Sequence, residues 1–177
     1  MPMKILIVDD DEAIRESMKK ILQREGFEVL LAPDGRVALE QIDPHGIDLL
    51  LLDIDLPGRN GWEVFEEFTA RRPALPVIVI TGHAGQFPIA RSAGVDVFME
   101  KPLDASKLLQ AIREVLATPD EERMRRLPGQ KGRTRHEPAT ARMIFEELRE
   151  WPGLPLARVA PLAAHDTTGI QTNEPRN

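Results

Sequence analysis

Cysteine is missing from this chain of 177 residues. Its absence excludes disulfide bonds, a thiol nucleophile, a Cys-x-x-Cys redox pair and a thiolate metal site. A chain of roughly 150 residues already buries about 70% of its unfolded surface on folding, so a stable core here needs neither a disulfide nor a structural zinc. The composition, 42% apolar and 29% charged, is that of an ordinary soluble globular protein.

Long hydrophobic runs are missing as well. The longest is the four leucines at positions 49–52, and Asp48 and Asp53 close it at both ends. A membrane-spanning helix needs about 20 apolar residues, so we expect no span and no membrane partner. Residues 1–8 combine one lysine with a short apolar run and do not have the pattern of a signal peptide. These features predict a cytoplasmic protein.

Basic residues are scarce in the larger part of the chain. Residues 1–117 contain 20 acidic and 13 basic residues, whereas residues 118–177 contain 9 acidic and 10 basic residues. An acidic excess repels the phosphates of nucleic acids. The charge of the first part therefore argues against nucleic acid as a partner.

Short aliphatic runs alternate with helical patterns over residues 1–117, and a final strong helix is predicted at residues 103–116. Five strands that alternate with helices form a parallel sheet, because each helical crossover returns the chain in the same direction. The predicted fold class is therefore α/β. The predicted strands are residues 4–8, 27–32, 48–53, 77–80 and 95–99.

The pattern weakens after residue 117. Thr118-Pro119 and the acids that follow predict a short helix, and residues 128–138, rich in Gly, Pro, Lys and Arg, predict a linker. Residues 138–151 have one apolar helical face, and residues 165–177 have the composition of a disordered tail. We thus predict three parts: a domain at residues 1–117, a short helix and basic linker at 118–137, and an amphipathic helix with its tail at 138–177.

Polar residues follow four of the predicted strands at the point where each strand ends. Asp9 and Asp10 follow the first, Asp53 ends the third, Thr81 follows the fourth and Lys101 follows the fifth. The carboxyl ends of parallel strands meet at one edge of a sheet, so these side chains are expected to converge. Clustered carboxylates repel one another unless a cation joins them, and Mg²⁺ prefers such oxygen ligands. Carboxylates, an ammonium and a hydroxyl together predict a phosphoryl-transfer site.

The chain resembles the receiver domain of bacterial two-component response regulators over residues 3–117. The resemblance rests on four stretches that occur in the order typical of the family: ILIVDDDE, DLLLLDIDLPGRNG, VIVITGH and FMEKPL. It implies a doubly wound, flavodoxin-like sheet with strand order 2-1-3-4-5. It also implies a phosphoacceptor in a phosphorelay rather than an enzyme, with a sensor histidine kinase or a phosphotransfer protein as donor and a downstream protein target.

The resemblance assigns a role to each site residue. Asp53 would accept the phosphoryl group. For Mg²⁺, Asp10 would be a direct ligand and Asp9 a mostly water-mediated one. Asp53 would be the third carboxylate at the ion, and Asp55 would bind the ion through its backbone carbonyl.

Three further roles concern the phosphoryl group and the response to it. Lys101 would contact the acyl phosphate, while Thr81 and Phe98 would form the switch pair. Many members of the family have Tyr where this chain has Phe98, which offers no hydroxyl to a partner. The chain from Thr81 to Lys101 is also about two residues shorter than usual, or roughly half a helical turn. The fourth helix is therefore expected to be short.

Several alternatives stay open. Asp53-Ile-Asp55 is also the start of a haloacid dehalogenase-like phosphatase motif, although Pro57 does not fit that motif. A cryptic DNA-binding C-terminus is a second alternative, but Pro155 and Pro161 interrupt the segment that would carry its recognition helix. His83 is either a ligand or general base beside the site or a solvated loop residue. Six basic residues also have two possible roles, contact with nucleic acid or membership of a solvated linker: Arg123, Arg125, Arg126, Lys131, Arg133 and Arg135.

Overall fold

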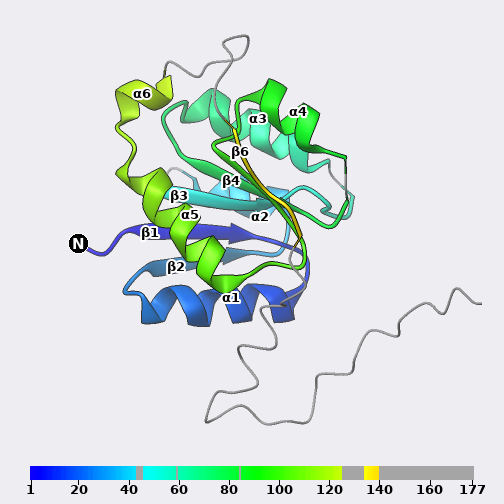
Figure 1. The fold of residues 1–177 in the computed structure, drawn as a ribbon. Helices are drawn as coiled ribbons and strands as arrows, with labels where there is room; N and C mark the ends of the chain where they lie inside the picture. The colour runs from blue at the N-terminus through cyan, green and yellow to red at the C-terminus, as the bar shows by residue number, and fades with distance from the viewer. Residues whose placement is uncertain (43–45, 59, 84, 125–133, 140–177) are drawn as a thin grey trace, which may run out of the picture.

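The computed structural model describes residues 1–42, 46–58, 60–83, 85–124 and 134–139. These residues form one parallel sheet with helices on both faces (Figure 1). The strands are β1 (Lys4–Val8), β2 (Glu28–Ala32), β3 (Leu49–Asp53), β4 (Val77–Thr81), β5 (Val97–Glu100) and β6 (Arg135–Glu137). The helices are α1 (Glu12–Arg24), α2 (Gly35–Gln41), α3 (Gly61–Arg71), α4 (Phe87–Ala93), α5 (Ala105–Ala117) and α6 (Asp120–Met124).

The strands lie in the order β2-β1-β3-β4-β5-β6, and every neighbouring pair is parallel. The predicted α/β class and the order 2-1-3-4-5 are therefore confirmed for the first five strands. β1, β3 and β4 are inner strands whose apolar residues are buried on both faces, as a parallel sheet covered by helices requires.

Alternate residues of the first five strands face two separate cores. Leu50, Leu52 and Val79 face the core that includes residues of α2, α3 and α4, whereas Leu51 and Ile80 face the core built with α1 and α5. This alternation follows from the two-residue repeat of a strand. The two helical layers thus hold the central strands from both sides and fix the positions of their carboxyl ends.

Side-chain caps begin four of the helices. Asp11, Asp34, Asn60 and Asp104 each precede a helix and accept hydrogen bonds from its first backbone N–H groups. Such caps satisfy N–H groups that have no partner within the helix.

Gly61 lets α3 approach the end of β3 closely. A Cβ atom at this position would lie 2.3 Å from the Cα of Ile54. Backbone at that distance cannot accommodate a side chain, so only glycine fits without moving α3. The Pro-Gly-x-Asn-Gly turn therefore fixes the segment that immediately follows Asp53.

The fourth helix is short, as predicted. α4 has seven residues and is capped at its C-terminus by Gly94, whose φ of 80° is in the left-handed region that favours glycine. The Val95 N–H then donates to the Ala90 carbonyl, which keeps Val95 in the helix end. For this reason β5 begins at Val97 rather than at residue 95.

The prediction of five strands is incomplete, because a sixth strand extends the sheet. β6 lies inside residues 128–138, which the sequence predicts to be a linker, and it pairs with β5 from Val97↔Arg135 to Met99↔Glu137. A strand of three polar residues has no hydrophobic period to reveal it. Its partners are instead charged and aromatic side chains of β5, α4 and α5, which lie far away in the sequence.

The short helix predicted after Thr118-Pro119 is present as α6. The predicted amphipathic helix at residues 138–151 and the tail that follows it lie outside the described residues, apart from residues 138 and 139. The division of the chain at residues 117 and 137 stays a prediction.

Candidate functional site

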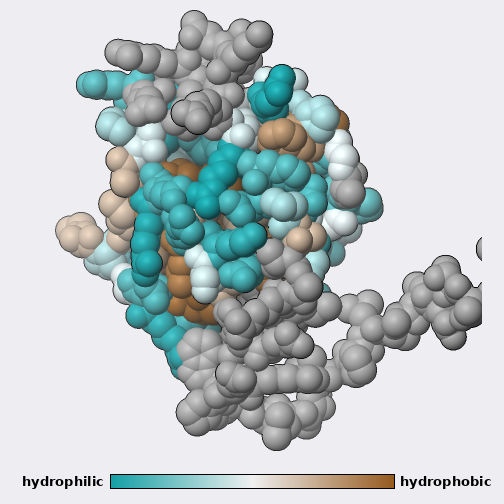
Figure 2. Space-filling view, in the orientation of Figure 1, coloured by the Kyte–Doolittle hydropathy of each residue, from teal (hydrophilic) through white to brown (hydrophobic). Residues whose placement is uncertain are grey.

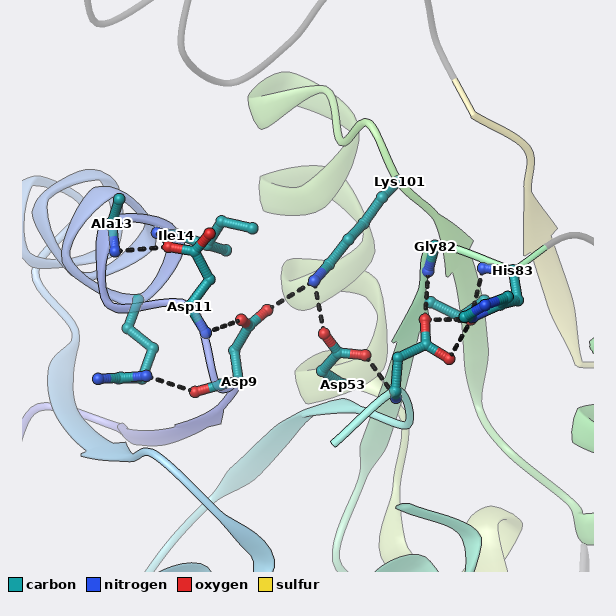
Figure 3. Close-up of polar contacts among 11 residues, drawn as sticks. Asp9, Asp11, Ala13, Ile14, Asp53, Gly82, His83 and Lys101 are labelled. Atoms are coloured by element: carbon teal, nitrogen blue, oxygen red, sulfur yellow. Dashed lines mark hydrogen bonds and ion pairs between the residues drawn. The ribbon is translucent and has the colours of Figure 1, made fainter. Parts of the chain in front are cut away.

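Side chains from the ends of four strands lie at one edge of the sheet, and Figure 3 shows three of them, Asp9, Asp53 and Lys101, pointing toward one another. Asp9 follows β1, Asp53 ends β3, Thr81 ends β4 and Lys101 follows β5. Asp10 joins this cluster: one carboxylate oxygen each from Asp9, Asp10 and Asp53 lie within 4.8 Å of one another. The convergence expected from the parallel sheet is thus what the structure has.

Lys101 lies between the two buried carboxylates of the cluster. Its Nζ is 2.9 Å from Asp9 Oδ2 and 2.5 Å from Asp53 Oδ2. The carboxylates are almost completely buried, at 0% exposure for Asp9 and 1% for Asp53. A buried charge is costly unless it is paired, so the single ammonium compensates for both acids.

Backbone N–H groups hold the second oxygen of each buried carboxylate. Asp9 Oδ1 accepts from the N–H of Asp11 at 2.9 Å, and Asp53 Oδ1 accepts from the N–H of Asp55 at 2.8 Å. Each carboxylate is therefore fixed at both oxygens, one by the lysine and one by the chain two residues further on. The arrangement orients the acids before any ligand arrives.

Burial and charge change the pKa values at this site in opposite directions. Burial raises the pKa of Asp9 to about 6 and Asp53 adds to this rise, although Lys101 opposes it. Burial alone would lower the pKa of Lys101, but its contacts with Asp53 and Asp9 outweigh burial and raise that pKa. The lysine thus stays charged, while Asp9 gains a proton more easily than an exposed aspartate does.

Asp55 turns its side chain away from Asp53 toward the loop after β4. Asp55 Oδ2 accepts from the hydroxyl of Thr81 at 2.9 Å and from the N–H of Gly82 at 2.6 Å, and Oδ1 lies 2.8 Å from Nδ1 of His83. Burial raises the pKa of Asp55, but the contacts with Gly82, His83 and Thr81 outweigh it, so the pKa is lowered. Thr81 therefore bonds to Asp55 in this structure, not to Asp53.

Phe98 lies in β5, away from the cluster. It is fully buried, and its ring centre is 5.9 Å from that of Phe87 in α4 and 5.5 Å from that of His136 in β6. The pairing of Thr81 with Glu100 connects the two predicted switch residues through neighbouring strands. Their role as a switch stays a prediction.

The acidic cluster fits a hard divalent cation. Three carboxylates face the Lys101 ammonium, and the Arg15 guanidinium donates to the Asp9 carbonyl at 2.6 Å, so negative charge still exceeds positive charge at the site. Mg²⁺ binds such oxygen ligands and would offset the excess. Asp9, Asp10 and Asp53 are the side chains that would hold it.

The raised pKa of Asp9 predicts a specific effect of pH on stability without divalent cations. An unfolded aspartate has a pKa of about 3.9, so between about pH 4 and pH 6 the folded protein binds more protons than the unfolded chain at this group. The contribution of Asp9 to the free energy of unfolding should therefore fall as the pH rises through this range, by about 3 kcal/mol at most. Urea unfolding of wild type and Asp9→Asn in EDTA measures this, and parallel pH profiles for the two proteins would contradict it.

A protein-family model described as the response regulator receiver domain matches residues 5–113. This chain belongs to that family. Members of this family are components of two-component systems. The family match confirms the resemblance that the sequence motifs indicate. Receiver domains generally act as phosphoacceptors rather than as enzymes, so membership favours this function over the phosphatase alternative.

Curated relatives support the same assignment. The chain is 37% identical over 125 residues to response regulator MprA of Mycolicibacterium vanbaalenii, an alignment that covers 68% of this chain and 54% of the relative. It is 36% identical over 114 residues to sensory transduction protein RegX3 of Mycobacterium tuberculosis, with 63% and 50% covered.

Solved structures resemble the same part of the chain. A CheY-like receiver domain protein from Methanospirillum hungatei has a TM-score of 0.63 and 38% identity, and the match covers 66% of this chain and 94% of that one. The receiver domain of NtrX from Brucella abortus has a TM-score of 0.60 and 38% identity, with 65% and 99% covered.

This chain spans about half the length of the curated relatives that it matches. The comparisons therefore give no support to the expectation that nucleic acid is not a partner. None of the helices in the described ranges has the length and apolar character of a membrane-spanning segment.

Two features near the receiver site are not visible in the sequence. The sequence favours a solvated loop for His83, and its side chain is indeed 74% exposed, but its Nδ1 contacts Asp55. His136 carries no signal at all, yet it contacts Phe87, Phe98 and Glu100. Both contacts join segments that are distant in the sequence, so no local spacing reveals them.

Proposed function

We propose that this protein is a phosphorelay response regulator whose Asp53 accepts a phosphoryl group in a Mg²⁺-dependent reaction. The observation that carries the proposal is the position of Lys101 between buried Asp9 and Asp53, with Asp10 beside them. The donor would be the phosphohistidine of a sensor kinase or of a phosphotransfer protein. The downstream partner would be a protein target, because residues 1–117 contain more acidic than basic residues and this excess repels the phosphates of nucleic acids.

The reaction transfers one phosphoryl group between two nucleophiles. A bond forms between a carboxylate oxygen of Asp53 and phosphorus, while the phosphorus–nitrogen bond of the donor breaks and its imidazole nitrogen keeps the electron pair. Asp9, Asp10 and Asp53, with the backbone carbonyl of Asp55, would hold Mg²⁺, which supplies positive charge against the phosphoryl oxygens. Lys101 would move part of its contact from Asp53 to those oxygens.

The direct test is phosphate uptake by the wild-type protein. With acetyl phosphate and Mg²⁺, we expect one phosphate per chain, bound as an acyl phosphate and therefore released by hydroxylamine. EDTA should suppress uptake, because removal of the cation leaves the acidic cluster with one lysine against three carboxylates. Steady turnover of a phosphomonoester without a stable phosphoprotein would instead favour the haloacid dehalogenase-like alternative.

Loss of the Thr81 hydroxyl should separate phosphorylation from the response to it. Thr81→Ala removes the hydrogen bond to Asp55 and the acceptor of the His83 N–H, but leaves Asp53 and Lys101 unchanged, so phosphate uptake should continue. The amide NMR shifts that phosphorylation causes over residues 82–110 should shrink, because the hydroxyl that would follow the phosphoryl group is gone.

Thr69→Ala is the matched control for this experiment. Among the described residues, its hydroxyl donates to two carbonyls within α3, those of Phe65 and Glu66. The control should respond to phosphorylation like wild type. Equal shifts in Thr81→Ala and wild type would show that Thr81 does not couple the site to the face of α4 and β5.

A further inference from the structure

The face formed by α4, β5 and α5 is already occupied by a segment of the same chain. β6 adds to the free edge of β5 and crosses the region between α4 and α5 (Figure 1). Its first residue donates from the Arg135 N–H to the Asp96 carbonyl at 3.1 Å. The outer surface on this side is largely hydrophilic, with an apolar patch over α4 (Figure 2).

Side chains of β6 alternate between two neighbours. Arg135 contacts Glu114 of α5, and Glu137 lies 3.5 Å from Lys107 of the same helix. His136 points to the other side, where its ring stacks on Phe87 of α4 at a centroid distance of 4.5 Å and an interplanar angle of 14°. The strand thus contacts both helices that border β5.

β6 also contacts a residue next to the phosphoryl-transfer lysine. The carboxylate of Glu100 lies 3.1 Å from His136 Nε2 and 3.4 Å from the N–H of Ala139. Glu100 precedes Lys101 and pairs with Thr81 across the sheet. Glu100 therefore connects β6 to both Lys101 and Thr81, so a movement of either residue can be passed to β6 through Glu100.

We propose that β6 is an intramolecular ligand of the α4–β5–α5 face and that phosphorylation of Asp53 releases it. The inference rests on the proposed function. Phosphorylation would draw the Thr81 hydroxyl from Asp55, which also holds Gly82 and His83 at the start of the loop that leads to Phe87. Phe87 then shifts relative to His136, and the stacked geometry that holds β6 is lost.

Only a short strand has to detach. β6 pairs with β5 over three residues, and its charged side chains reach exposed partners on α5, Lys107 and Glu114, so each ion pair contributes modestly. The aromatic stack is thus the main contact that a movement of α4 can break. By linkage, a docked β6 also opposes phosphorylation to the same extent.

Hydrogen exchange of the full chain tests the proposal. On treatment with acetyl phosphate and Mg²⁺, the amides of residues 134–137 and 139 should exchange at least about fivefold faster, the lower end of typical coupling between sites. The amides of β1 should not change. His136→Ala should show the fast exchange without phosphorylation and reach a higher phosphorylation level than wild type at limiting acetyl phosphate.

Two further variants make the result specific. His136→Phe keeps a ring against Phe87 and should exchange more slowly than His136→Ala, and Arg36→Ala, in an exposed ion pair of α2, should behave like wild type. If wild type takes up phosphate but residues 134–137 and 139 exchange at an unchanged rate, the release of β6 is wrong and the proposed function stands. If wild type takes up no phosphate, the proposed function fails and the coupling with it.

Discussion

Asp53→Asn should take up no phosphate from acetyl phosphate under conditions that label the wild-type protein. An amide oxygen is not a competent nucleophile for phosphorus, and the substitution changes neither the size of the side chain nor its 1% exposure appreciably. Lys101 keeps its contact with Asp9, so the fold should persist. The measurement is hydroxylamine-labile phosphate per chain, with circular dichroism as the check on folding.

Two neighbouring aspartates provide the controls. Asp10→Asn removes a carboxylate from the acidic cluster, so labelling should need a higher Mg²⁺ concentration but still reach Asp53. Asp55→Asn disturbs the contacts with Thr81 and His83 yet leaves the Asp53 carboxylate in place, so labelling should persist. A phosphatase that used Asp55 as general acid would lose its turnover instead, and label on Asp53→Asn equal to wild type would exclude Asp53 as the acceptor.

The sequence predicts the sheet and the convergence of the site residues for one physical reason. The strands are continuous apolar runs such as the leucines at positions 49–52, which are buried on both faces of the sheet. Once these strands are parallel, their carboxyl ends must meet, and Asp9, Asp53, Thr81 and Lys101 come together without any further information. The family match then covers the same residues.

The features that the sequence does not predict depend on polar side chains with distant partners. Arg123 and Arg135 belong to a group of basic residues for which the sequence leaves open nucleic-acid contact or a solvated linker. Arg123 is instead buried, and Arg135 begins β6. No hydrophobic period marks either residue, and Arg125, Arg126, Lys131 and Arg133 of the same group lie outside the described residues.

Arg123 should be among the most important single side chains for the stability of the described fold. Its side chain is only 6% exposed. The guanidinium donates to the carbonyls of Val115 at 2.5 Å, Thr118 at 2.8 Å and Ala74 at 3.1 Å, and Nε lies 3.6 Å from Asp96 Oδ1. One side chain thus joins the end of α5, the segment before β4 and the segment before β5.

Arg123→Ala should lower the free energy of unfolding by about 3 kcal/mol. The variant removes the cation beside the buried Asp96 carboxylate, and it leaves three carbonyls without this donor. Without Arg123, α6 would detach and water would reach the Asp96 carboxylate. Hydration of this carboxylate keeps the loss of unfolding free energy near the lower end of the range for a buried ion pair that loses one partner. Urea unfolding measures the change directly.

Three comparisons decide whether this loss comes from the buried guanidinium. Arg36→Ala removes an arginine that is 70% exposed and should change the free energy of unfolding by less than about 0.5 kcal/mol. Arg123→Lys keeps the charge but not the planar set of donors, so it should recover only part of the stability. Phosphate uptake at Asp53 should be unaffected in folded Arg123→Ala, because Arg123 contacts the segment before β4 and the end of α5 rather than the acidic cluster. A loss for Arg123→Ala as small as that for Arg36→Ala would show that these hydrogen bonds contribute no more than exposed ones.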